Sequence, residues 1–204
     1  MFNIKKSLRV SLKGLRKFRV KGTGAGGYKT NEHGKQFEDL TNNETRLISQ
    51  GFTKTLLNKN KFGYYLSKKE NENDETIFIL QGGLIDYMKQ MYSIELFRNP
   101  DEAYIIKTPE TTTIKILEKK YQNCNGSVET KLWASPSLKR EYELVCGEQF
   151  RIEYALCLSD WFKQQNSIKY TILNKILGET GIKVLYSDNN YFENLDKWIY
   201  FTLG

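Results

Sequence analysis

Two short segments rich in β-branched and aromatic residues lie close together in the middle of the 204-residue chain. Residues 104–106 read Tyr-Ile-Ile and residues 113–117 read Thr-Ile-Lys-Ile-Leu, compositions that favour strands. The turn-like residues 109–112 lie between them and allow an antiparallel return. The sequence therefore predicts a central β-hairpin, which restricts the fold to one built around a sheet.

Helix and strand patterns alternate on both sides of this hairpin. Strands are predicted at residues 16–20, 61–67, 76–80, 150–158 and 182–186. Helices are predicted at residues 34–50, 84–92, 135–145, 168–177 and 191–199. The polar stretch 68–75 is expected to form a hairpin tip. This interleaving predicts a single α/β domain with a mixed central sheet flanked by helices.

The composition excludes several classes of protein. A hydrophobic content of 39% supports one packed core, and the absence of a long apolar run argues against a membrane-spanning helix. Cys124, Cys146 and Cys157 are too few and too scattered for a disulfide framework, which favours reduced thiols in a cytoplasmic protein. With His33 as the single histidine, any mechanism that needs two histidines is excluded.

Positive charge is concentrated at the N-terminus. Residues 1–31 hold nine Lys or Arg residues and no acid, so subtracting them from the net charge of +7 leaves −2 for residues 32–204. We therefore divide the chain into a basic arm with a glycine-rich loop (1–31) and a domain (32–204). The arm is interpreted as a phosphate-binding segment, a targeting presequence or a solvated face.

A candidate site lies at one end of the predicted hairpin. Asp101 follows Pro100 at the start of the first strand, and Glu118 lies 17 positions later at the end of the second. Side chains alternate along a strand, so Glu118 and Lys120 share a face while Lys119 points away. Two carboxylates and an ammonium would then converge. Carboxylates suit Mg²⁺, and a lysine beside a metal-bound water suits phosphodiester hydrolysis.

These residues carry a resemblance to a known family. Asn99-Pro100-Asp101, followed by an apolar strand ending in Glu118-x-Lys120, resembles the PD-(D/E)xK nuclease superfamily, which includes many restriction endonucleases. The resemblance implies a restriction-endonuclease-like fold, Mg²⁺ as the cofactor and double-stranded DNA as the substrate. It also implies that Asp101, Glu118 and the Lys119 carbonyl hold the metal and that Lys120 is the catalytic lysine.

Further site residues follow from the same resemblance or from charge. Many members of the family carry an acid on the first core helix, where Glu38 lies. A glycine-rich loop flanked by lysines and a helix starting near Ser135 could both contact phosphates, although a solvated helix face is an equal alternative at the second place. The residues predicted to bind DNA are Lys21, Lys29, Asn31, Lys35, Gln122, Lys139 and Arg140.

The sequence predicts a Mg²⁺-dependent type II restriction endonuclease that acts as a homodimer, without a membrane or a small-molecule cofactor. Glu129-Thr130-Lys131 is a second acid-x-Lys, but the strand pattern before Glu118 favours Glu118. A structure-specific repair or junction nuclease and a non-catalytic nucleic-acid-binding protein are the alternatives. The recognition sequence, the cut position and any partner methyltransferase stay open.

Overall fold

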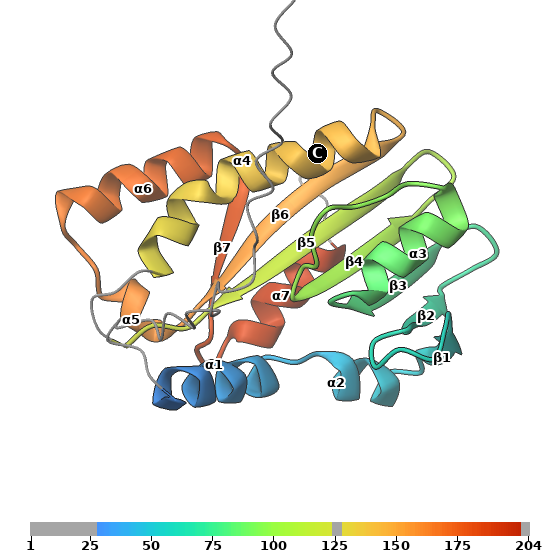
Figure 1. The fold of residues 1–204 in the computed structure, drawn as a ribbon, viewed down its shortest axis with the longest axis horizontal. Coiled ribbons are helices and arrows are strands. Elements are labelled where there is room, and N and C mark those ends of the chain that lie inside the picture. The colour runs from blue at the N-terminus through green and yellow to red at the C-terminus, as the bar shows by residue number, and fades with distance from the viewer. Residues whose placement is uncertain (1–27, 124–127, 201–204) are drawn as a thin grey trace, which may run out of the picture.

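The computed structural model describes residues 28–123 and 128–200, with side chains from Glu32 onward (Figure 1). It is a single α/β domain with one seven-stranded mixed sheet and helices on both faces, as the alternation of patterns predicted. The predicted strand at 16–20, the glycine-rich loop at 22–27 and Lys21 lie outside the described residues. Within the described part, no helix is long and apolar enough to cross a bilayer.

The strands follow one another across the sheet in chain order. Neighbours from β1 to β5 pair antiparallel, whereas β5, β6 and β7 pair parallel. Helix α4 makes the crossover from β5 to β6, as a parallel connection requires. The strands are β1 (Thr53–Leu56), β2 (Tyr64–Lys69), β3 (Glu75–Leu80), β4 (Glu102–Lys107), β5 (Thr112–Lys120), β6 (Phe150–Leu158) and β7 (Ile182–Tyr186).

Helices cover the sheet from both sides (Figure 1). Ile114 and Ile116 of β5 belong to a core that α3, α4 and α6 cover, whereas Leu117 belongs to a second core under α1, α2 and α7. Strand alternation explains this division. The helices are α1 (Tyr28–Leu40), α2 (Glu44–Ser49), α3 (Gly83–Tyr92), α4 (Val128–Cys146), α5 (Asp160–Lys163), α6 (Ile168–Glu179) and α7 (Tyr191–Tyr200).

The predicted helix at 34–50 is in fact two helices. The chain leaves α1 after Leu40 and starts α2 at Glu44. The side-chain oxygen of Asn42 accepts the main-chain N–H of Glu44 at 2.8 Å, and the hydroxyl of Thr41 donates to the carbonyl of Phe37 at 2.7 Å. Side chains of this kind compete with helical hydrogen bonds, so the helix ends here.

The predicted start of the next long helix is also wrong. Helix α4 begins at Val128, and Pro136 lies inside it. Lys139 and Arg140 therefore lie in the middle of α4, and the expected phosphate site at a helix start near Ser135 does not exist. In the turns before the proline, Leu132 is buried in the core under the helix, and this packing stabilises them.

Candidate active site

At the open end of the β4–β5 hairpin, away from its turn, Asp101 lies beside the last residues of β5. In the antiparallel register Glu102 lies opposite Leu117, so Asp101, one residue earlier, is level with Glu118. The main-chain N–H of Lys119 donates to Oδ2 of Asp101 at 2.6 Å. The separation of 17 positions therefore closes into direct contact between the two strand ends.

Lys120 joins the two carboxylates. Its Nζ lies 2.6 Å from Oε2 of Glu118 and 3.4 Å from Oδ2 of Asp101. All three side chains are partly shielded from solvent, with exposed fractions between 16% and 23%. The three residues that the sequence placed together thus form one ion-pair cluster on one face of the sheet.

Charges in this cluster influence one another. Burial raises the pKa of Glu118 above its ordinary value, and the charge of Asp101 adds to this effect although Lys120 opposes it. Burial also raises the pKa of Glu38, again with help from Asp101. The charge of Asp101 therefore raises the pKa of both glutamates.

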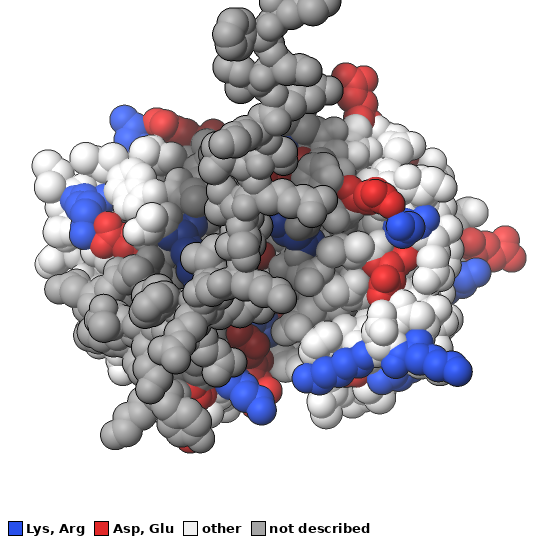
Figure 2. Space-filling model, in the orientation of Figure 1, with Lys and Arg blue, Asp and Glu red and all other residues white. Residues whose placement is uncertain are grey.

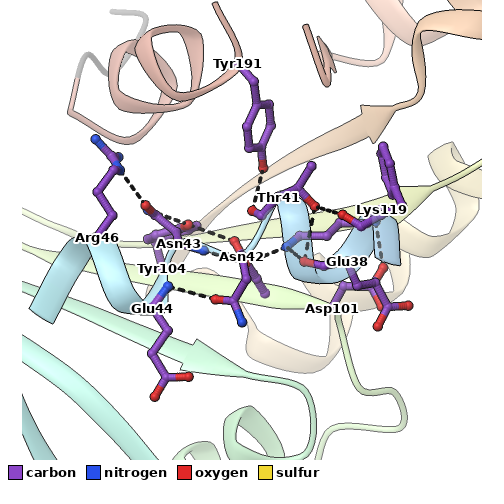
Figure 3. A network of polar contacts seen from close by, with 12 residues as sticks. Glu38, Thr41, Asn42, Asn43, Glu44, Arg46, Asp101, Tyr104, Lys119 and Tyr191 are labelled. Atoms are coloured by element: carbon purple, nitrogen blue, oxygen red, sulfur yellow. Dashed lines mark hydrogen bonds and ion pairs between the residues drawn. The ribbon is translucent and has the colours of Figure 1, made fainter. Parts of the chain in front are cut away.

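Glu38 reaches this region from α1. It borders a hollow of about 160 Å³ that Asp101 also lines, and Figure 3 shows both residues beside Lys119. Nζ of Lys119 lies 3.5 Å from the main-chain oxygen of Glu38. The hollow is lined by Lys35, Glu38, Asp39, Asn42, Lys61, Phe62, Leu80, Gln81, Asp101 and Lys119.

The side chain of Lys119 points to the opposite face of the sheet, as strand alternation predicted. Its Nζ lies 2.6 Å from Oε1 of the fully buried Glu102. Glu102 also accepts hydrogen bonds from the Tyr104 hydroxyl at 2.9 Å and from the main-chain N–H of Asn43 at 3.3 Å. Sequence reasoning missed Glu102, although its alternation with Asp101 along one strand places it behind the cluster.

Gln122 is buried just beyond β5. Its main chain exchanges two hydrogen bonds with the hydroxyl of Ser159, at 3.1 and 2.6 Å. Neither polar atom of its side-chain amide has a hydrogen-bond partner among the described residues. An unpaired buried amide is costly, and both of these atoms are shielded from solvent, so the predicted contact of Gln122 with DNA stays a prediction.

The other residues predicted to bind DNA are dispersed. Lys35 is exposed on α1, whereas the side chains of Lys29 and Asn31 lie outside the described part of the chain. Lys139 donates to the carbonyl of Thr180 at 2.8 Å, next to the start of β7. Lys120, by contrast, is level with the end of β7. Arg140 pairs with Glu143 at 2.8 Å, so no common surface joins Lys139 and Arg140 to the cluster.

The alternative acid-x-Lys does not end a strand. Glu129-Thr130-Lys131 lies in the first turn of α4, and Glu129 forms an ion pair with Lys169 at 2.6 Å. Its main chain therefore lacks the extended geometry that places an acid and a lysine on one face. This geometry favours Glu118 and Lys120 as the acid and lysine of the site.

The donor set at the hairpin end suits a hard divalent cation. The ammonium of Lys120 lies between the carboxylates of Asp101 and Glu118. Oxygens of both carboxylates therefore surround one position where a positive charge is stabilised. Two carboxylates and a main-chain carbonyl are oxygen ligands of the kind that Mg²⁺ prefers. Over residues 28–123 and 128–200, no three His, Cys, Asp or Glu side chains form a metal-binding group. Any metal here would need main-chain or water oxygens as well.

Comparisons of the chain with protein-family models, with curated protein sequences and with solved structures find no match.

Proposed function

We propose that the chain is a Mg²⁺-dependent endonuclease that hydrolyses phosphodiester bonds of double-stranded DNA, with the sequence-specific cleavage of a type II restriction enzyme. The observation that carries this proposal is the convergence of Asp101, Glu118 and Lys120 in one partly buried ion-pair cluster at the end of the β4–β5 hairpin. On a solvated surface, two carboxylates have no reason to share one lysine, and burial does not raise the pKa of a glutamate. In this cluster both carboxylates pair with one lysine, and burial raises the pKa of Glu118.

The architecture supports the finer assignment of the fold. A mixed sheet flanked by helices is what the resemblance to the PD-(D/E)xK superfamily implies, and the acid after Pro100 lies directly before strand β4, close to its place in that family's pattern. We extend the proposal by analogy to a homodimer in the cytoplasm, because one site per chain cuts one strand.

Each residue has a role that its position supports. Asp101, Glu118 and the main-chain carbonyl of Lys119 would hold the metal, and Glu38 would add a carboxylate from the far side of the hollow. When bound, Mg²⁺ lowers the pKa of a water molecule and polarises a phosphate oxygen. Lys120, within hydrogen-bonding distance of Glu118, orients the attacking water and the scissile phosphate.

A plasmid digest tests the proposal. Supercoiled and linear plasmid are incubated with the full chain, with Mg²⁺ or with EDTA, and the ends of any products are mapped. We expect discrete fragments with Mg²⁺ only. Asp101→Ala and Lys120→Ala should retain DNA binding and lose cleavage by a factor of about 10² or more, the range for a positioned acid–base group.

Matched variants make the result specific. Glu148→Gln and Lys175→Ala alter exposed residues of the same types and should cleave like the parent chain. Full cleavage by both site variants would refute the assignment. Salt-sensitive binding that EDTA leaves unchanged, with no product, would indicate a binding protein instead. Cleavage of branched duplexes alone would indicate a structure-specific nuclease.

A further inference from the structure

The hollow beside Asp101 has two walls that come from distant parts of the sequence. Helix α1 supplies one wall with Lys35, and the β1–β2 connection supplies the other with Lys61. Asp101 and Glu38 line the space between them. A volume of about 160 Å³ has room for about five water molecules of ~30 Å³ each, far less than a pocket for a drug-sized ligand. The hollow therefore suits a small polar group.

The wall formed by the β1–β2 connection is fixed in place. The main-chain N–H of Leu57 donates to the carbonyl of Gly63 at 2.7 Å, and the Asn58 amide donates to Asp86 of α3 at 2.7 Å. Gly83 packs so closely under this connection that a Cβ atom there would lie 2.4 Å from the carbonyl oxygen of Phe62. Lys61 is therefore carried on a rigid support.

The two wall lysines are available to bind an anion. Lys35 and Lys61 are exposed, and neither has an ion pair with any residue in the described part of the chain. Lys61 instead lies over the Phe62 ring, with Nζ 4.7 Å from its centre. Figure 2 shows Lys and Arg side chains gathered at the lower right, where the β1–β2 hairpin lies. The neighbouring Lys59 is exposed too.

Gln81 adds a strained backbone to the same hollow. Its φ is +42°, in the left-handed region that disfavours a residue with a side chain. Strain of this kind persists where the surrounding structure enforces it, and it is concentrated at functional sites. Gln81 lines the hollow and brings a neutral amide, which can donate to an oxygen without adding charge.

We propose that Lys35 and Lys61 clasp a backbone phosphate of duplex DNA in this hollow, with Gln81 as a third donor. The inference rests on the proposed function, because it places this phosphate beside the one that is cut. Carboxylates in the hollow repel a phosphate, so its binding there needs cations on the walls. Lys35 and Lys61, which form no ion pair with another described residue, supply them. Asp39 on the rim opposes binding.

The test measures DNA affinity against salt concentration. The full chain is titrated in EDTA with a fluorescein-labelled DNA duplex, by anisotropy, between 50 and 200 mM salt. Each phosphate contact contributes about 0.9 to the slope of log affinity against log salt. Because both lysines contact the same phosphate, we expect the double variant Lys35→Ala/Lys61→Ala to lower the slope by about 0.9 and each single variant to lower it by no more than that. Asp39→Asn should bind more tightly than the parent chain.

Lys175→Ala, an exposed lysine on α6, is the matched control and should keep the parent slope. An unchanged slope in the double variant would overturn the proposed phosphate clasp. A change in only the Mg²⁺ concentration needed for cleavage would also overturn it, because the hollow would then bind a cation and not a phosphate. Cleavage with an unaltered slope refutes the clasp alone. A reduced slope in a chain that never cleaves refutes the nuclease and leaves a phosphate-binding hollow.

Discussion

Lys119 and Glu102 form a buried ion pair directly behind the cluster of Asp101, Glu118 and Lys120, on the other face of the sheet, with Nζ 2.6 Å from Oε1. The pair reaches beyond the hairpin, because Glu102 accepts the N–H of Asn43 and Lys119 approaches the main-chain oxygen of Glu38. It therefore ties the junction of α1 and α2 to the two strands that carry Asp101 and Glu118.

Breaking this pair on one side should destabilise the fold strongly. Lys119→Met leaves the carboxylate of Glu102 buried without its cation, and we expect a loss of about 3–5 kcal/mol in the free energy of unfolding. Urea denaturation measures it. Lys68→Met, which removes an exposed pair with Glu70, should cost less than about 1 kcal/mol. Equal losses in the two variants would contradict the structural role of Glu102.

Two glycine-to-alanine substitutions should change the free energy of unfolding in opposite directions. Gly83→Ala places a Cβ atom 2.4 Å from the carbonyl oxygen of Phe62, so we expect a loss of about 1–3 kcal/mol as the β1–β2 connection shifts. Gly34→Ala has nothing within 4 Å and lies inside α1, so it should gain about 0.5–1 kcal/mol. Thermal unfolding compares them, and a stabilised Gly83→Ala chain would show that the connection packs differently.

Two substitutions of Gln81 distinguish an effect on stability from an effect on DNA binding. Gln81→Gly removes the strain of a positive φ and should raise the free energy of unfolding by up to about 1 kcal/mol. The same change removes the amide from the hollow and should weaken DNA binding in the anisotropy assay. Gln81→Ala keeps the strain and loses the amide, so it should weaken binding without stabilising the chain. Parental affinity in both variants would exclude a contact from Gln81.

Thiol reactivity should depend on folding. Burial raises the pKa of Cys146 to about 11 and that of Cys157 to about 12, so both thiols stay protonated at pH 8. Iodoacetamide attacks the thiolate. In a Cys124→Ser chain, we therefore expect labelling only after unfolding in urea.

The sign of the pH dependence follows from the same shifts. The folded state binds these protons more tightly than the unfolded state, so the stability they contribute is complete below the ordinary thiol pKa near 9 and falls as the pH rises through 11 and 12. Cys157→Ala should make the fall in stability above pH 9 less steep. Rapid labelling of the folded Cys124→Ser chain at pH 8 would contradict the burial of both cysteines.

Local patterns predicted the elements that pack on the core. The strand at 150–158 matches β6, and the segments 104–106 and 113–117 lie within β4 and β5, because their alternating apolar residues face two buried layers. Strand β1 was missed because all four of its residues are exposed and it carries no burial pattern. Pro136 misled the prediction of α4, since proline usually marks the first turn of a helix.

The sequence could predict only the part of the candidate site that one hairpin forms, because pairing of its two adjacent strands determines which side chains meet. Asp101, Glu118 and Lys120 follow from strand pairing and alternation within one hairpin. The partnership of Lys119 with Glu102, and the approach of Lys61 to the hollow, depend on how α1 and the β1–β2 connection pack on the sheet. Charged residues at such positions look like ordinary surface residues until long-range packing is known.

The local origin of the cluster makes it sensitive to the phase of a single strand. One residue inserted into β5 ahead of Glu118 would rotate every later side chain to the opposite layer. The glutamate and Lys120 would then face the apolar core under α7, and Lys119 would turn towards Asp101. Related chains can therefore differ in the length of the 108–111 turn. A change of length within β5, by contrast, would separate Glu118 and Lys120 from Asp101.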